Sequence, residues 1–381
     1  MMKRLLLIVS FLGLGAGLMT TLFQPTKQAP IQEDLVSLDQ KIGTMLLVGF
    51  RGTTQTDPEI KSISTYLEKG QIGGIIFYDY NIESPDQTQS LIQHFKSSQT
   101  NSRIFVAIDQ EGGFVQRLPQ SKGFRHFSSP YYLAQTSSPE EAYDHYFDMA
   151  KLLKDLGFNL NFGTVVDINT NPQSPAIGLL RRSYSADPSI VATYAGKMID
   201  AHRQNDVISA IKHFPGHGSA LADSHKGFTN VTDTWSFKEL LPYKYLLEQK
   251  KVDMIMTAHV FHTRLDPYSP ASLSKQHINK TLRHFLNYAG VIITDDLQMR
   301  AISKMFDLRT TIIKSIQSEV DILLFANLNL YNIDVVQEAH RIIKEGIESG
   351  DIDPQLIHRA YDRIEALKAK RYAHTLMSKT E

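Results

Sequence analysis

The sequence predicts a single α/β domain built as a TIM-like (β/α)8 barrel, preceded by an N-terminal signal or anchor helix. Three observations predict it: eight short apolar runs rich in Val, Ile and Phe, amphipathic stretches between most of them, and no Pro-, Gly- or Ser-rich linker after residue 31. Apolar runs that alternate with helical stretches are typical of βαβ units and a parallel sheet. Eight such units in a chain of this length fit a closed barrel better than an open, doubly wound sheet.

The apolar runs and the helical patterns follow one another along the chain. The expected strands are 45–50, 72–78, 104–109, 160–167, 207–213, 252–259, 291–295 and 320–325. The clearest expected helices between them are 58–68, 139–156, 189–204, 236–250 and 279–288. Two further helices, 334–348 and 354–371, follow the last strand and are expected to pack on the outside of the barrel.

The composition describes an ordinary globular protein with a large core. Hydrophobic residues make up 42% of the 381 residues, charged residues make up 21%, and there is no cysteine. Lys+Arg and Asp+Glu are both 40, so the zero net charge argues against a nucleic-acid partner. The lack of cysteine excludes disulfides, thiolate zinc sites and a cysteine nucleophile. We expect a monomer.

The first 30 residues are predicted to be an export signal with its linker, outside the fold. Lys3 and Arg4 precede an uncharged run over residues 5–23, which together form a basic n-region and an apolar h-region. The run is long for a cleaved signal and just long enough to span a bilayer, so a membrane tether and a cleaved signal both stay open, with a buried hydrophobic helix as the third alternative. The two positive charges place the rest of the chain outside the cytoplasm, in the periplasm or at the extracytoplasmic face of the membrane. The barrel domain is expected to occupy residues 31–381.

Reactive side chains stand at the carboxyl ends of five expected strands, where an α/β barrel carries its chemistry. These side chains are Asp109, Asp167, the pair Lys212 and His213, His259, and the pair Asp295 and Asp296. Asp167 and His259 are equally consistent with structural hydrogen bonding at a strand end. The repetition over five strands nevertheless predicts an active-site face.

The segment 212–225 is the richest of these strand ends. It contains Lys212, His213, His217, Asp223 and His225, together with two glycines and a proline, which is typical of a polar loop. A histidine oriented by a carboxylate is suited to donating protons near neutral pH, and Asp223 is close enough in sequence to orient His225. The same histidines and Asp223 also offer enough ligands for zinc. A third interpretation is a loop whose histidines only satisfy backbone groups.

Two other strand ends carry acids beside further polar groups. In the segment 109–118, Asp109 ends a strand, a Gly pair follows, and Arg117 offers a forked donor, so the segment is suited to gripping sugar hydroxyls. In the segment 291–299, Asp295 and Asp296 end a buried strand. Because neighbouring strand residues point to opposite sides, only one of the two acids is expected to face the barrel mouth, as a candidate nucleophile.

These segments resemble, in order, the β-N-acetylglucosaminidase branch of glycoside hydrolase family 3. The matching stretches are IDQEGGFVQRL, VVDINTNPQSPAIG with RSYSADP, IKHFPGHGSALADSH, MTAHV with DPYSPASLS, and VIITDDLQM. The resemblance runs from about residue 40 to 330. It implies a TIM-like barrel, no cofactor and no metal, and a glycan substrate that contains N-acetylglucosamine, in peptidoglycan or its fragments.

The resemblance also implies a role for each site residue. Asp295 is the nucleophile that forms a glycosyl-enzyme, and His225, paired with Asp223, is the general acid/base. Asp109, Arg117, Arg182, Lys212 and His213 bind the sugar, with Arg181 as the alternative to Arg182 because the family usually has fewer residues between the glycine and the arginine. Retention through a covalent intermediate follows. Two alternatives stay open: a phosphorylase, because a histidine acid/base lets phosphate approach, and a non-catalytic glycan-binding barrel.

Overall fold

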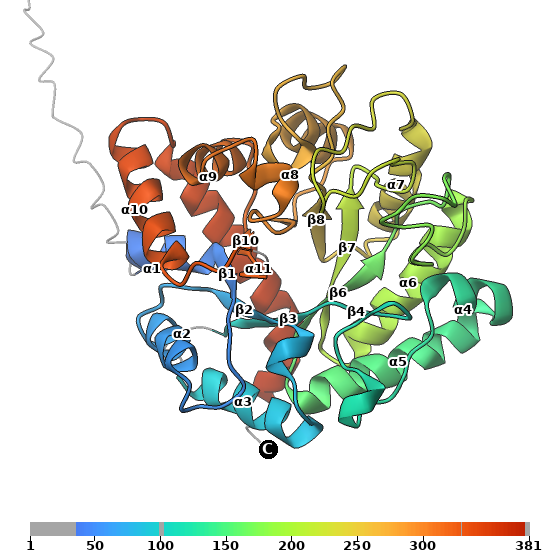
Figure 1. Ribbon diagram of the computed structural model, residues 1–381, viewed down its shortest axis with the longest axis horizontal. Helices are drawn as coiled ribbons and strands as arrows, with labels where there is room; N and C mark the ends of the chain where they lie inside the picture. The colour runs from blue at the N-terminus through green and yellow to red at the C-terminus, as the bar shows by residue number, and fades with distance from the viewer. Residues whose placement is uncertain (1–35, 99–102, 329, 378–381) are drawn as a thin grey trace, which may run out of the picture. The chain divides into compact units, whose positions relative to one another are not determined.

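The computed structural model describes residues 36–98, 103–328 and 330–377, and these residues form one compact unit. Eight of its strands build one parallel sheet: β1 (Leu46–Gly49), β2 (Gly74–Phe77), β3 (Phe105–Ile108), β6 (Leu160–Val165), β7 (Ile208–Phe214), β8 (Met254–Thr257), β9 (Val291–Thr294) and β10 (Leu323–Phe325). Each falls inside or within one residue of an expected strand. Their order, β10–β1–β2–β3–β6–β7–β8–β9, follows the chain around a ring, as Figure 1 shows.

The ring closes between β9 and β10. Ile293 and Ile322 form a parallel bridge there, and the Thr294 amide donates to the Ile322 carbonyl at 3.0 Å. Beyond the strand ends, the Leu297 amide donates to the Leu324 carbonyl at 2.9 Å. The predicted fold class, a (β/α)8 barrel, is confirmed.

The strands are short, continuous apolar runs because each is covered on both faces. Every residue of the eight strands is buried. One face packs into the barrel interior and the other against the surrounding helices, so no position favours an alternating polar residue. Because both faces are buried, the strands appear in the sequence as continuous apolar runs, without alternation of apolar and polar residues.

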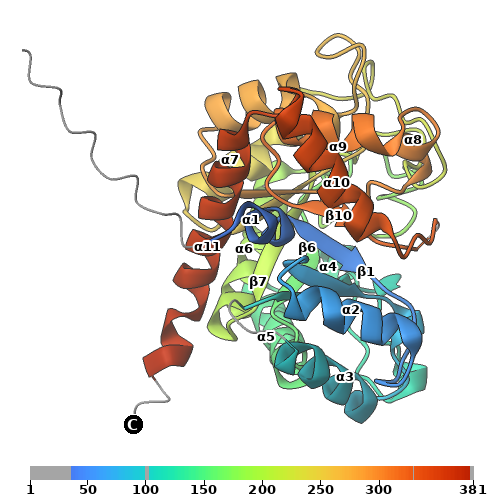
Figure 2. The ribbon, with the colours of Figure 1, turned by 90° about the vertical axis from the view of Figure 1, so that its left-hand side faces the viewer.

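The helices form the outer layer of the barrel (Figures 1 and 2). They are α1 (Leu38–Thr44), α2 (Pro58–Glu68), α3 (Pro85–Ser97), α4 (Pro130–Thr136), α5 (Pro139–Leu156), α6 (Pro188–Gln204), α7 (Leu241–Glu248), α8 (Arg300–Ser303), α9 (Leu308–Gln317), α10 (Val335–Glu348) and α11 (Pro354–Met377). Short 3-10 turns are η1 (Asp79–Asn81), η2 (Gln120–Lys122), η3 (Phe237–Leu240) and η4 (Ala271–Leu273), and η5 (Gln276–Phe285) is a π-helix.

Local sequence signals set the helix ends where the prediction was accurate. Helix α5 begins with a capping box, in which the Ser138 hydroxyl accepts from the Glu141 amide at 3.2 Å and the Glu141 carboxylate accepts from the Ser138 amide at 2.7 Å. It ends at Gly157, whose φ of 103° is available to glycine without strain. The expected helix 139–156 therefore matches α5 at both ends.

Two expected helices are wound differently in the structure, and a third, expected over 354–371, ends later, at Met377. The expected helix 236–250 is split into η3 and α7, because Pro242 lacks the amide hydrogen that a continuous helix needs and is accommodated only in the first turn of a new one. The expected helix 279–288 begins earlier, at Gln276, and is wound as a π-helix, with the Lys280 amide donating to the Lys275 carbonyl. Neither change alters the order of the strands.

The two ends of the barrel differ in what covers them. Helix α11 crosses the amino-terminal end: the Lys368 ammonium lies 5.1 Å from the centre of the Phe105 ring, and Arg363 binds Asp321 at 2.9 Å. At the opposite end, the hairpin of β4 (Gln110–Gly112) and β5 (Val115–Gln116) extends directly from β3. The carboxyl ends of the strands are thus left to the loops, as in other barrels of this type.

The predicted export signal, its tether through residues 5–23 and its linker lie outside the described residues. Among the residues that the structure describes, no helix is long and apolar enough to span a bilayer. The boundary at residue 31 and the cellular location remain predictions.

Candidate active site

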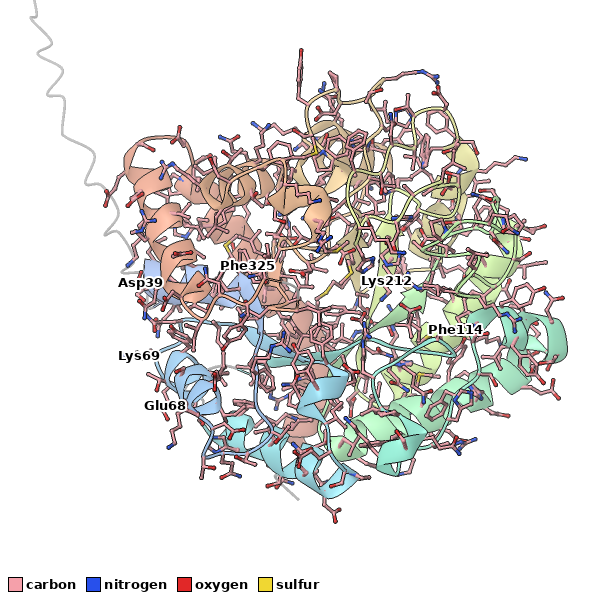
Figure 3. All side chains as sticks on the ribbon, in the orientation of Figure 1. Asp39, Glu68, Lys69, Phe114, Lys212 and Phe325 are labelled. Atoms are coloured by element: carbon pink, nitrogen blue, oxygen red, sulfur yellow. The ribbon has the colours of Figure 1, made fainter. Side chains whose placement is uncertain are left out.

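A cavity of about 270 Å³ opens at the carboxyl ends of the strands. All eight predicted site residues line it: Asp109, Arg117, Arg182, Lys212, His213, Asp223, His225 and Asp295. Figure 3 labels Lys212 on β7, toward the middle of the ring of strands. The structure therefore brings together residues that span almost two hundred positions of the chain.

Both acids at the end of β9 face this cavity, so the expectation that only one would do so is wrong. Strand β9 ends at Thr294, and Asp295 and Asp296 lie in the turn beyond it, where side chains no longer alternate. The Asp296 amide donates to Asp295 Oδ1 at 2.8 Å. Asp296 Oδ1 in turn accepts from the amides of Ala326 at 2.9 Å and Gln298 at 3.0 Å.

The surroundings drive the pKa values of the two acids apart. Burial by itself raises the pKa of Asp295, but the electrostatic interactions with His259, His213 and His225, together with the hydrogen bond from the Asp296 amide, outweigh burial and lower the pKa. Burial raises the pKa of Asp296 to about 6, and the negative charge of Asp295 adds to that rise. Asp295 is therefore the acid that stays ionised, as a nucleophile must.

Asp109 and Lys212 belong to a buried ionic network across the cavity. Lys212 Nζ binds Asp109 Oδ1 and Glu111 Oε1, each at 2.7 Å. The Arg182 guanidinium donates two hydrogen bonds to the Glu111 carboxylate, at 2.8 and 2.7 Å. Burial opposes ionisation of Asp109, but the charges of Lys212 and Arg117 outweigh it and bring its pKa to about 2. Asp109 is thus held as an acceptor facing the cavity.

Glu111 is the site residue that the sequence analysis missed. It lies in the segment 109–118 but was not assigned a role, because its sequence position gives no sign that it is fully buried between Arg182 and Lys212. The structure also places the two candidate arginines differently. Arg182 lines the cavity, whereas Arg181 is exposed, with a left-handed φ of 54°.

Replacing Glu111 with glutamine is expected to destabilise the protein by about 3 kcal/mol, because it leaves Arg182 and Lys212 buried without a full countercharge. The matched control is Glu140→Gln, which removes an exposed ion pair with Lys197 and should leave the melting temperature unchanged. Thermal unfolding followed by circular dichroism measures both. Equal melting temperatures for the two variants would contradict a structural role for Glu111.

His213 is held in one tautomer between two charged groups. Its Nδ1 lies 2.7 Å from Asp167 Oδ2, and its Nε2 lies 3.2 Å from the Arg182 guanidinium. Burial, with the charges of Arg182 and Lys212, lowers the pKa of His213 well below its usual range. Neutral His213 therefore donates from Nδ1 to Asp167 and accepts at Nε2 from Arg182. Asp167 acts through His213 and lies outside the residues that line the cavity.

Asp223 and His225 form the predicted pair on the loop after β7. His225 Nδ1 lies 2.9 Å from Asp223 Oδ1, and the His225 amide donates to the same oxygen at 3.0 Å. Burial by itself lowers the pKa of His225, but the hydrogen bond to Asp223 and the charges of Asp295 and Asp223 outweigh burial and raise the pKa. The hydrogen bond from His225 holds the pKa of Asp223 at about 2. The His225 side chain is half exposed, so it can exchange protons with solvent and substrate.

The other two histidines are fixed by structural hydrogen bonds. His259 is fully buried between the Ser272 hydroxyl, at 2.6 Å, and the Asp296 carbonyl, at 2.8 Å, which agrees with the structural interpretation. His217 Nε2 lies 3.1 Å from the Ser224 hydroxyl. Among the described residues, no group of three or more His, Asp or Glu side chains is arranged to hold a metal ion. The zinc interpretation therefore lacks a ligand set in this loop.

The loop that carries the pair is fixed at its base. The Trp235 indole N–H donates to the Pro215 carbonyl at 3.0 Å, and the Gly218 amide donates to Glu239 Oε2 at 3.2 Å. Burial raises the pKa of Glu239 to about 8, so this carboxyl is largely neutral near pH 7. The base of the loop is thus tied to the barrel, while Leu221 and His225 lie further out and are exposed.

Comparison with known proteins agrees with this geometry. Residues 37–367 match the family model of the glycosyl hydrolase family 3 N terminal domain. The chain is 30% identical to Beta-hexosaminidase A of Pseudoalteromonas piscicida, covering 88% of this chain and 61% of that protein. It is 33% identical to Beta-hexosaminidase of Haemophilus influenzae, covering 74% and 79% of the two chains.

A solved structure, a glycoside hydrolase family 3 β-N-acetylglucosaminidase from a Paenibacillus species, superposes with a TM-score of 0.80 at 31% identity, covering 88% of this chain and 63% of the other. The chain thus spans about three fifths of the length of two of these relatives. The resemblance seen in the sequence motifs is confirmed over nearly the whole barrel. The chain belongs to glycosyl hydrolase family 3.

Proposed function

We propose that this chain is an exo-acting, retaining β-N-acetylglucosaminidase that removes terminal N-acetylglucosamine from peptidoglycan or its fragments. The observation that carries the proposal is the single cavity that holds an ionised Asp295 and the hydrogen-bonded pair of Asp223 and His225. Its volume of about 270 Å³ suits one sugar at the end of a glycan. The names of the relatives, beta-hexosaminidase and β-N-acetylglucosaminidase, support the same substrate class.

In the first step, Asp295 attacks the anomeric carbon while the glycosidic oxygen departs. A bond forms between the carboxylate oxygen and C1, the C1–oxygen bond breaks, and protonated His225 gives its proton to the departing oxygen. Asp223 stabilises the charged imidazolium and fixes its orientation through Nδ1. The raised pKa of His225 favours the protonated form that this step needs.

In the second step, the now neutral His225 accepts a proton from water while the water oxygen attacks C1. The bond to Asp295 breaks, the carboxylate is regenerated, and the configuration at C1 is retained. Asp109, Lys212 and Arg182 provide an acceptor and two charged groups for the sugar hydroxyls, with Arg117 and neutral His213 completing the set. Their buried network makes these groups rigid, so that the sugar is oriented before the chemistry begins.

The pH dependence of kcat/KM is expected to show a fall on the alkaline side as His225 loses its proton. Replacing Asp223 with asparagine removes the hydrogen-bonded carboxylate that raises the pKa of His225, so this fall should move to lower pH. The matched control is Asp233→Asn, which changes an exposed carboxylate paired with Arg264. Initial rates across the pH range measure the shift. An alkaline limb that stays in place in the Asp223 variant would contradict the assignment of His225.

The proposed function is tested with residues 31–381 on chromogenic β-N-acetylglucosaminide and β-glucoside, each with and without phosphate. Turnover of the acetamido sugar alone, with free N-acetylglucosamine as product, is the expected result. Sugar 1-phosphate formed only with phosphate present would instead show a phosphorylase, which the uncharged base form of His225 permits. No turnover of these substrates or of peptidoglycan fragments, together with binding of the fragments, would show a non-catalytic glycan-binding barrel.

A further inference from the structure

Tyr78 contributes to the cavity a hydroxyl group that the proposed mechanism does not use. The residue directly follows β2, lines the cavity and is 4% exposed. Its ring is fixed from two sides, by the Arg117 guanidinium 5.3 Å from the ring centre and by the stacked Tyr80 ring at 5.7 Å. Among the hydrogen bonds of the described residues, Tyr78 takes part through its amide, which donates to Asn81 Oδ1 at 3.0 Å, and none uses its hydroxyl.

The charges around Tyr78 keep this hydroxyl protonated. Burial raises its pKa, and the negative charges of Asp109 and Asp296 raise it further. The hydroxyl therefore remains a neutral donor that can also accept. A hydroxyl of the bound sugar is the partner that fits such a group.

The order of the strands shows which edge of the sugar lies near Tyr78. Around the ring of eight strands, β3 with Asp109 lies opposite β9 with Asp295. In a six-membered sugar ring C4 lies opposite C1, so a sugar whose C1 meets Asp295 directs C4 toward Asp109. Its two remaining edges then face two walls, one formed by β6, β7 and β8 and the other by β10, β1 and β2.

The two walls differ in chemistry, as do the two edges of the sugar. Lys212, His213 and Arg182 supply charged and polar groups on the side of β6 and β7. On the other side the lining includes Tyr78, with Arg117 over its ring, and the apolar side chains of Leu324 and Leu328. The edge with C2 and C3 carries an acetamido group and a hydroxyl, whereas the edge with C5 carries one CH₂OH group. The wall that carries the Tyr78 hydroxyl and the two leucines, and that offers few polar groups, matches the CH₂OH edge.

We propose that the Tyr78 hydroxyl hydrogen-bonds the 6-hydroxyl of the sugar that Asp295 attacks, which makes Tyr78 a substrate-binding residue. This inference rests on the proposed function. It adds a contact that selects sugars with a free 6-hydroxyl over sugars that lack it or carry a substituent there. A site built to pair a substrate hydroxyl discriminates against analogues without it, because the protein group is then left unpaired.

The test is Tyr78→Phe, which removes the hydroxyl and keeps the ring under Arg117. The matched control is Tyr80→Phe, because Tyr80 stacks on the Tyr78 ring and its hydroxyl is buried without a partner among the described residues, but Tyr80 does not line the cavity. On aryl β-N-acetylglucosaminide, the Tyr78 variant should lose about tenfold in kcat/KM, while the Tyr80 variant should match the wild type. On the 6-deoxy substrate the wild type should lose a similar factor, and Tyr78→Phe should cause no further loss.

Comparing the two variants on the 6-hydroxy and 6-deoxy substrates distinguishes a loss of the hydrogen bond from a structural effect of the substitution. A Tyr78→Phe loss that is the same on the 6-hydroxy and 6-deoxy substrates would overturn the proposal, as would wild-type activity in the Tyr78 variant. Melting temperatures of both variants, expected to stay close to that of the wild type, verify that they fold. A wrong proposed function would give another result, because the wild type itself would then not turn over the acetamido sugar.

Discussion

Replacing Asp295 with asparagine is expected to reduce kcat/KM by at least about a thousandfold, because an amide oxygen cannot form the glycosyl-enzyme. Asparagine has the same size as aspartate, and its amide oxygen can still accept from the Asp296 amide, which lies 2.8 Å from the present carboxylate oxygen. The turn beyond β9 should therefore keep its structure. Initial rates on aryl β-N-acetylglucosaminide measure the loss.

Two controls distinguish the loss of the nucleophile from a loss of folding or of sugar binding. The variant should keep the melting temperature of the wild type and should still bind N-acetylglucosamine in calorimetry, since Asp109, Lys212 and Arg182 are unchanged. A slow fluorinated substrate analogue should add the mass of one sugar to the wild type and none to the variant. Substantial turnover by the variant, or labelling of it at another residue, would show that Asp295 is not the nucleophile.

Replacing His225 with alanine is expected to cost about 10² to 10⁴ in kcat/KM for substrates with a sugar leaving group, because the departing oxygen then lacks its proton donor. A 2,4-dinitrophenyl leaving group departs without a proton, so the first step on that substrate should be nearly unaffected. His284→Ala, which changes an exposed histidine on η5, is the matched control and should leave both substrates unchanged.

The second step provides an independent readout for His225. Without a base to deprotonate water, the glycosyl-enzyme of the His225 variant should accumulate on the dinitrophenyl substrate. Azide needs no deprotonation and should therefore restore turnover, with a glycosyl azide of retained configuration as product. Equal losses on both leaving groups, with no rescue by azide, would assign His225 a structural role and would require another proton donor.

The sequence by itself determined the fold class, the positions of the eight strands and the eight predicted residues of the cavity. Strands such as β3 and β9 were visible because both of their faces are buried, which leaves an uninterrupted apolar run. Parallel strands of a barrel end on the same face, so polar residues at the strand ends had to meet there. The motifs supplied the roles, because their order and spacing resemble those of a known family.

Only the tertiary structure decided how these residues interact. Glu111 is paired with Arg182, 71 positions away, and with Lys212, and neither contact can be deduced from local sequence. Asp296 faces the cavity because β9 ends one residue too early for the alternation of a strand to apply. Arg117 lies over Tyr78, its guanidinium 5.3 Å from the ring centre, although the two residues belong to different strand ends. Strand and helix patterns reflect interactions between near neighbours in the chain, whereas these contacts exist only once the barrel has closed and has buried the charges together.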